Sequence, residues 1–164
     1  MKKLILVLIA VMSMTLAANA QTTTTTNEHN SGKAIGVRAG SGTGTGAEFT
    51  FQQLIGSNNR VELDLGYSQN SDNYINFAAA YHWRFPIAGD FNWFIGPCVN
   101  VGHCGNHGWG LAAGAQGGAE WNPANIPWLQ VAVDGRPLYD FIMDPNCYYR
   151  GFAYGVALSA RYKF

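Results

Sequence analysis

The C-terminal segment carries the feature that most limits how this chain can fold, a strict alternation of large apolar residues with small or charged ones. Every second position of residues 151–164 belongs to one apolar set, namely Phe152, Tyr154, Val156, Leu158, Ala160, Tyr162 and Phe164. The positions between them hold Gly, Ala, Ser, Arg and Lys. Because successive side chains of a β-strand point to opposite faces, this period of two predicts a strand with one apolar face.

The same alternation recurs along most of the chain, in segments that clusters of Gly, Asn, Asp, Ser and Pro separate. Predicted strands cover residues 33–40, 46–54, 60–68, 74–85, 91–102, 111–122, 128–141 and 151–164. Beyond residue 20, no segment has the roughly 20 consecutive apolar residues that a membrane helix needs. The pattern therefore predicts an all-β domain of eight antiparallel strands.

The polar faces of these strands indicate which kind of all-β domain this is. They combine many Gly and Ala with polar and charged residues, which are Arg38, Glu48, Gln52, Arg60, Glu62, Asp64, His82, Arg84, Gln116, Glu120, Asp134, Arg136, Asp140, Arg161 and Lys163. Small and charged residues suit a narrow interior, and large apolar residues suit contact with lipid. An open sheet edge is costly in lipid, and eight strands can close around an interior filled by side chains. We therefore expect a closed, antiparallel transmembrane β-barrel with an up-and-down meander.

Aromatic residues gather where predicted strands meet short turns. Six of them flank the turns after the fourth and sixth segments, namely Trp83, Phe85, Phe91, Trp93, Trp121 and Trp128. Membrane barrels carry aromatic girdles at the level of the lipid headgroups. These residues are expected to form one such girdle.

The first residues have the pattern of a secretory signal peptide. Lys2 and Lys3 precede an apolar run over residues 4–16, and Ala18-Asn19-Ala20 matches the cleavage motif. We expect residues 1–20 to be removed, residues 21–32 to be a flexible polar leader, and residues 33–164 to form the barrel. Removal takes two of ten Lys and Arg and none of ten Asp and Glu, which leaves a net charge of −2. No nucleic-acid partner is predicted.

In these features the chain resembles the small eight-stranded outer-membrane barrels of the OmpA and OmpX type, over residues 33–164. Its last strand, which ends in Tyr162 and Phe164, is similar to the C-terminal signal that the barrel assembly machinery recognises in such proteins. The resemblance implies a monomer in the lipid of the cell outer membrane, with both chain ends in the periplasm. The outer loops would be residues 41–45, 69–73, 103–110 and 142–150. They are short, which weakens any transfer of adhesin or receptor function from the family, and the sequence does not identify an extracellular ligand.

The chain has three cysteines, an odd number. Cys104 and Cys147 would lie in the third and fourth outer loops, on the oxidising side of the membrane, and we predict a disulfide between them. The alternative is a soft metal site of His103, Cys104, His107 and Cys147. Cys98, on a polar strand face, would be a buried free thiol. Counting reactive thiols in unreduced, denatured protein separates the alternatives, because the disulfide leaves one and the metal site leaves three.

The interior charges have both signs in similar number. Arg60, Arg84, Arg136 and Arg161 stand against Glu62, Asp64, Glu120 and Asp134. Desolvated charges persist only when they are paired. The expected result is a lumen closed by salt bridges, and the alternative is a path for conduction.

Signs of enzyme chemistry are weak. His82 has no Ser two positions on, and the outer loops offer no Ser beside His103 or His107. The glycine-rich residues 40–46 join two strands, whereas a phosphate-binding loop opens a helix. We predict a non-enzymatic integral outer-membrane barrel without a cofactor, with a structural or surface-interaction role. The alternatives are an outer-membrane lipid-modifying enzyme and a soluble periplasmic ligand-binding barrel.

Overall fold

The structure, a computed structural model, describes residues 32–41, 46–68, 74–104, 108–142 and 151–164. The predicted signal peptide and nearly all of the predicted leader lie outside these residues. The described part is all-β, and its strands are β1 (Lys33–Ser41), β2 (Ala47–Ile55), β3 (Asn59–Ser68), β4 (Tyr74–Ala88), β5 (Phe91–Cys104), β6 (Gly108–Trp121), β7 (Leu129–Gly135), β8 (Leu138–Ile142), β9 (Phe152–Ala153) and β10 (Val156–Lys163). Among the described residues, no helix has the length and apolar character that crossing a membrane requires.

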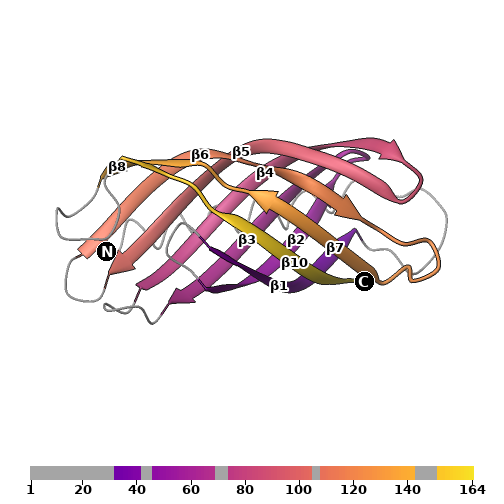
Figure 1. The fold of residues 1–164 in the computed structure, drawn as a ribbon, viewed down its shortest axis with the longest axis horizontal. Coiled ribbons are helices and arrows are strands. Elements are labelled where there is room, and N and C mark those ends of the chain that lie inside the picture. Colours follow the sequence, from indigo (N-terminus) through magenta and orange to yellow (C-terminus); the bar gives the residue numbers. More distant parts are fainter. Residues whose placement is uncertain (1–31, 42–45, 69–73, 105–107, 143–150) are drawn as a thin grey trace.

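The strands close into a single barrel. From β1 to β7 each strand pairs antiparallel with the next along the chain, including the long β5–β6 ladder from Phe91↔Trp121 to Cys104↔Gly108. β8 also pairs with β6, β9 pairs with β8, and β10 pairs with β7. The ring is completed by the first and last strands, which pair from Ala34↔Lys163 to Ser41↔Val156. Figure 1 shows the strands tilted around the long axis of the barrel. Closure removes the edges at which backbone groups would lack partners.

The predicted seventh strand is interrupted once, between β7 and β8, at Arg136 and Pro137. Pro137 has no backbone N–H, so it cannot donate to the neighbouring strand, although its carbonyl oxygen accepts a bond of 3.1 Å from Ala115. The register against β6 is the same before and after the interruption, with Gly117↔Gly135 and Gly114↔Leu138. The two elements therefore form one barrel strand.

The predicted last strand has a similar interruption, at Tyr154 and Gly155, between β9 and β10. There Arg136 and Gly155 exchange two backbone hydrogen bonds of 2.8 and 3.2 Å. The ten elements are thus eight strands of a closed antiparallel meander, and the predicted fold class is confirmed.

Three predicted strands were too short. The fourth strand runs past Pro86 to Ala88, the fifth reaches Cys104, and the sixth begins at Gly108. Pro86 was expected to open a turn, but a break in the β4–β5 register between Pro86 and Ala88 accommodates it. The turn itself is only Gly89 and Asp90, and Gly89 has a φ of 52° that favours glycine.

The two faces of the strands differ as their alternation predicts. On β10, for example, Leu158 is 57% exposed and Ser159 is 0% exposed. Exposed apolar residues cover the outside of the barrel, while the inside holds alanines together with polar and charged side chains.

Exposed aromatic residues lie near both ends of the barrel. We call the end with the turns of Gly56 and Gly89 and with Phe164 the turn end, and the opposite end the loop end. At the turn end, rings pair as Phe85–Trp93, Phe91–Trp121 and Trp128–Tyr162, with centroids 4.5, 6.3 and 6.0 Å apart. Toward the loop end, Trp109, Tyr139, Phe141, Phe152 and Tyr154 are exposed. The exposed apolar surface is thus bordered by rings on both sides.

Candidate functional site

The charged side chains inside the barrel are the candidate site. The structure brings together the eight interior charges that the sequence singled out, which are Arg60, Glu62, Asp64, Arg84, Glu120, Asp134, Arg136 and Arg161. Seven of these residues are buried, and the Arg84 side chain is 19% exposed. Alternation places them on the inner face, since their strand neighbours point outward. Two further inward residues, Arg38 and Glu48, join the same network.

The first group of charges, here called the central cluster, consists of Arg38, Arg136, Glu48, Asp64 and Asp134. Arg38 binds Glu48 at 2.7 Å and Asp134 at 2.6 Å. Arg136 binds Glu48 at 3.2 Å and also pairs with Asp64. These contacts join strands that are not neighbours in the sheet, since Arg136 follows β7 and Asp64 lies on β3. The cluster therefore crosses the lumen.

Amide side chains and one more ion pair extend this network along the barrel. Gln116 donates to Glu62 at 2.9 Å and accepts from Arg136 Nε at 3.2 Å. Arg161 pairs with Glu62 at 3.1 Å. Asn76 donates to Glu48 at 2.9 Å. Glu62 thus joins Arg161 to the central cluster, through Gln116 and Arg136.

The second group, here called the turn-end cluster, consists of Arg60, Arg84, Lys163 and Glu120. Glu120 Oε1 accepts from Arg84, with Nη2 at 2.7 Å, and Glu120 Oε2 accepts from Arg60 Nη1. Arg60 Nε donates to His82 Nδ1 at 3.1 Å. The Arg60 guanidinium also lies 4.4 Å from the centroid of the Phe94 ring, within cation–π range. One carboxylate thus holds two guanidinium groups.

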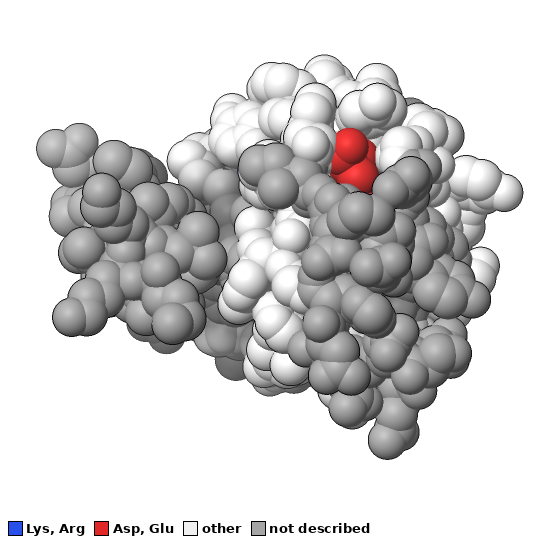
Figure 2. Space-filling view, turned by 90° about the vertical axis from the view of Figure 1, so that its left-hand side faces the viewer, with Lys and Arg blue, Asp and Glu red and all other residues white. Residues whose placement is uncertain are grey.

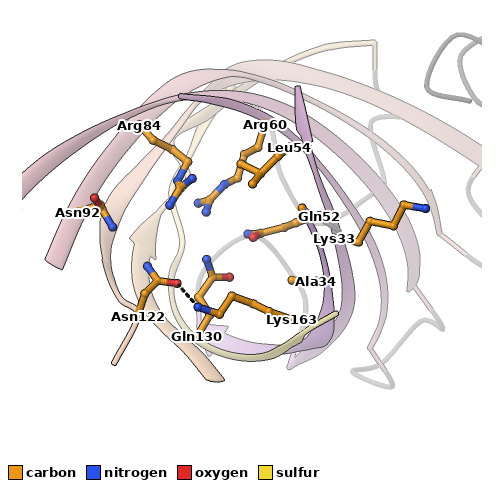
Figure 3. Close-up of a pocket in the computed structure, with 11 residues that line it drawn as sticks. Lys33, Ala34, Gln52, Leu54, Arg60, Arg84, Asn92, Asn122, Gln130 and Lys163 are labelled. Atoms are coloured by element: carbon orange, nitrogen blue, oxygen red, sulfur yellow. Dashed lines mark hydrogen bonds between the residues drawn. The ribbon is translucent and has the colours of Figure 1, made fainter. Parts of the chain in front are cut away.

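The turn-end cluster borders a cavity of about 230 Å³ (Figure 3). The guanidinium groups of Arg60 and Arg84 and the side chains of Gln130 and Lys163 point into it. The Lys33 side chain also borders the cavity but points away from its centre. Lys163 Nζ donates to Asn122 Oδ1 at 3.3 Å, the contact drawn as a dashed line.

His82 does not have the geometry of a catalytic base in a triad. The base of a triad donates its Nδ1 hydrogen to an orienting carboxylate. In this structure His82 Nδ1 accepts a hydrogen bond from Arg60. The ring also packs on Phe94, with centroids 4.7 Å apart.

Only some of the cysteines and histidines in the predicted sites lie among the described residues. Cys98 is buried with a free thiol, beside Ala78, Ala80, Ala112 and Leu138. The side chain of Cys104 and the whole of His107 and Cys147 lie outside the described residues, so the Cys104–Cys147 disulfide stays a prediction. Within the described part of the chain, no three His, Cys, Asp or Glu residues are grouped as metal ligands.

The loop end differs in charge from the turn end. In the view of Figure 2, acidic atoms are visible at this end, and no Lys or Arg is seen among the described residues. Asp140 lies on β8 toward this end, and its Oδ2 atom is buried without a hydrogen-bond partner.

Three polar residues of the interior network were not singled out from the sequence, namely Thr50, Asn122 and Gln130. Thr50 accepts a hydrogen bond from Arg161 Nε at 3.2 Å. Gln130 donates to Glu120 at 3.1 Å, and Asn122 donates to the same carboxylate at 3.2 Å. The alternation along the strand was an available signal, because Gln130 lies an even number of positions from Asp134 and so shares its strand face. Asn122 likewise has the same position in the alternation as Glu120, so the same signal was available there.

Comparisons with known proteins agree with this architecture. No family model matches the sequence, and a search of curated proteins gives no match. Among solved structures, Neisserial surface protein A (NspA) superposes with a TM-score of 0.60 at 16% identity, over 84% of this chain and 100% of that one. Ail, the attachment invasion locus protein of Yersinia pestis, gives a TM-score of 0.45 at 13% identity, over 84% and 100%. The closed eight-strand meander and the superposition on NspA together show that this chain has the fold of the small eight-stranded outer-membrane β-barrels.

Proposed function

We propose that this chain is a non-enzymatic integral outer-membrane protein whose lumen is closed by its own side chains, with a structural or surface-interaction role. The observation that carries the proposal is the set of ion pairs across the barrel, centred on Arg136, inside an exterior of exposed apolar residues. A soluble barrel that binds an apolar ligand would have the opposite distribution, with its apolar face inside.

The exterior supports a location in the membrane. Exposed apolar residues such as Val37, Leu65, Val99 and Leu158 lie between the aromatic residues of the two ends. This order matches the apolar band and aromatic girdles of outer-membrane barrels. We place the turn end in the periplasm and the loop end outside the cell.

Membrane insertion has two direct tests. The protein is expected in the outer-membrane fraction, whereas a soluble periplasmic barrel would stay in the supernatant. Unheated protein should also migrate anomalously on a denaturing gel and shift after boiling, because a closed barrel has no edge from which detergent can separate it. Identical migration before and after heating contradicts the closed barrel.

Closure of the lumen predicts that the barrel does not conduct. An eight-stranded barrel has an interior just wide enough for side chains, and the central cluster occupies part of it. Purified protein in planar bilayers should give no large, steady current steps. Such steps would refute the closed lumen and restore the conduction alternative.

The enzyme alternative is tested on the lipid itself. The lipid A composition of cells with and without the protein should be the same if the chain is non-enzymatic. A change in acylation that depends on the protein would identify it as a lipid-modifying enzyme.

A further inference from the structure

The cavity at the turn end has properties that closure of the lumen does not require. Its volume of about 230 Å³ far exceeds the roughly 10–15 Å³ that a single water needs. Residues from several strands line it close to the turn end, including Gln52 on β2, Arg60 on β3 and Gln130 on β7. None of the described residues that line it is acidic.

The charges around the cavity do not balance. Arg60, Arg84 and Lys163 contribute three positive charges, and Glu120 is the carboxylate that binds the two arginines. Both Glu120 oxygens already accept hydrogen bonds from these guanidinium groups. The cluster therefore has an excess of two positive charges, which favours an anion in the cavity.

Two buried polar atoms of the lining lack hydrogen-bond partners, and they are of opposite kinds. Arg60 is 1% exposed, and its Nη2 donor has no partner. Gln130 is 3% exposed, and its Oε1 acceptor has no partner. The Gln130 amide cannot be reversed without loss, because its Nε2 donates to Glu120 at 3.1 Å. Buried polar groups without partners are costly, so a ligand that accepts from Arg60 Nη2 and donates to Gln130 Oε1 would be favoured in this cavity.

We propose that the turn-end cavity binds a phosphate group that keeps a proton, that is, hydrogen phosphate or the singly ionised form of a phosphomonoester. An unprotonated phosphate oxygen accepts from Arg60 Nη2, where a charge-assisted bond is favoured. The P–O–H group donates to Gln130 Oε1. Lys163, which uses one of its three donors on Asn122, supplies further charge. The inference does not depend on which side of a membrane the turn end faces.

Titration calorimetry on the refolded protein in zwitterionic detergent, at constant ionic strength and neutral pH, tests this site. Inorganic phosphate should bind at one site per barrel. Sulfate has a similar size and charge but no proton, so its affinity should be at least about tenfold lower, the effect of one lost hydrogen bond to a buried group. The absence of saturable phosphate binding, or equal affinity for sulfate, would overturn the proposal.

Two variants locate the site. Lys163→Gln should weaken phosphate binding by roughly tenfold or more, because it removes a charge from the cavity. Lys33→Gln removes the same charge from a side chain that points away, and it should bind as the native protein does. Equal weakening in both would indicate diffuse attraction to a basic surface and would contradict a defined site. The gel shift on heating confirms that each variant is folded.

A third variant tests the unpartnered donor. Arg60→Lys keeps the charge but lacks the forked guanidinium, so it should lose affinity although the excess of positive charge is unchanged. Unchanged affinity would contradict the role of Arg60 Nη2.

The source of the phosphate is decided by competition. At about pH 5.5, below the second pKa of about 6 that is typical of a phosphomonoester, the headgroup of phosphatidic acid keeps its P–O–H donor. The diester of phosphatidylglycerol has no such donor. If phosphatidic acid in mixed micelles competes with inorganic phosphate and phosphatidylglycerol does not, the site takes a lipid headgroup. If neither lipid competes, it takes a soluble phosphate.

Discussion

The central cluster and the turn-end cluster lie in the same lumen but balance their charges in opposite ways. In the central cluster two arginines contact three carboxylates, of Glu48, Asp64 and Asp134. In the turn-end cluster three cations surround Glu120. Adding the Arg161–Glu62 pair gives five arginines and five carboxylates, so the buried arginine and acid charges balance as a whole while their distribution is uneven.

The difference follows exposure to water. Both arginines of the central cluster have side chains that are 5% exposed or less. In the turn-end cluster the Arg84 side chain is 19% exposed and Lys163 is half-buried. Arg60, the third cation there, is as buried as the central arginines and has Glu120 as its direct partner. A fully buried charge needs direct partners, whereas water and small ions can compensate a charge near an opening. The central cluster therefore closes the barrel, and the turn-end cluster leaves positive charge available at its end.

The largest expected effect is at the centre. Arg136→Gln removes the partner of Asp64 and one partner of Glu48, and should lower the free energy of unfolding by about 3–5 kcal/mol. The measurement is denaturant unfolding of the barrel in detergent or vesicles. A loss below about 1 kcal/mol, the value typical of an exposed pair, would show that the central cluster is no more tightly coupled than a surface ion pair.

The next largest effect is on the outer surface of the barrel, where a residue in the middle is compared with one near the turn end. Leu158 pairs with Val133 in the middle of the sheet, and Ile87 is an exposed residue beside the β4–β5 turn. Leu158→Arg should destabilise by about 2–4 kcal/mol if it meets the bilayer midplane, and Ile87→Arg by about 0–1 kcal/mol near the interface. Ser159→Arg, on the inner face, is the companion variant that acts through lumen packing. Normal insertion of Leu158→Arg would refute the assignment of the lipid-facing side.

The smallest effect is at the turn end. Arg84→Gln leaves Glu120 paired with Arg60 and should cost about 1 kcal/mol. Because the pair is near water, this cost should fall as the salt concentration rises, whereas the cost of Arg136→Gln should not change with salt. Unfolding of both variants at low and high salt is the measurement. A cost that is independent of salt for Arg84→Gln would remove the distinction between the two clusters.

Much of the fold was predictable because strand alternation is a local property. Residues such as Leu158 and Ser159 take opposite faces in any strand, so the sequence separates lipid-facing from interior positions before any partner is known. Strand ends were less predictable. Proline was read as a turn signal at Pro86, where the strand continues to Ala88, and the effect of Pro137 inside a strand was not anticipated.

The sequence by itself determined that eight alternating strands would enclose charges of both signs, since the alternation alone places Arg136 and Asp134 on the inner face. Only the tertiary structure decided which charges meet. Arg38 contacts Asp134, 96 positions away, and Arg60 contacts Glu120, 60 positions away. These distances along the chain have no local signal, because strand tilt, register and closure together set which inward side chains reach one another across the lumen. The cavity beside Arg60 and Gln130 results from the same closure, and no pattern within a single strand predicts it.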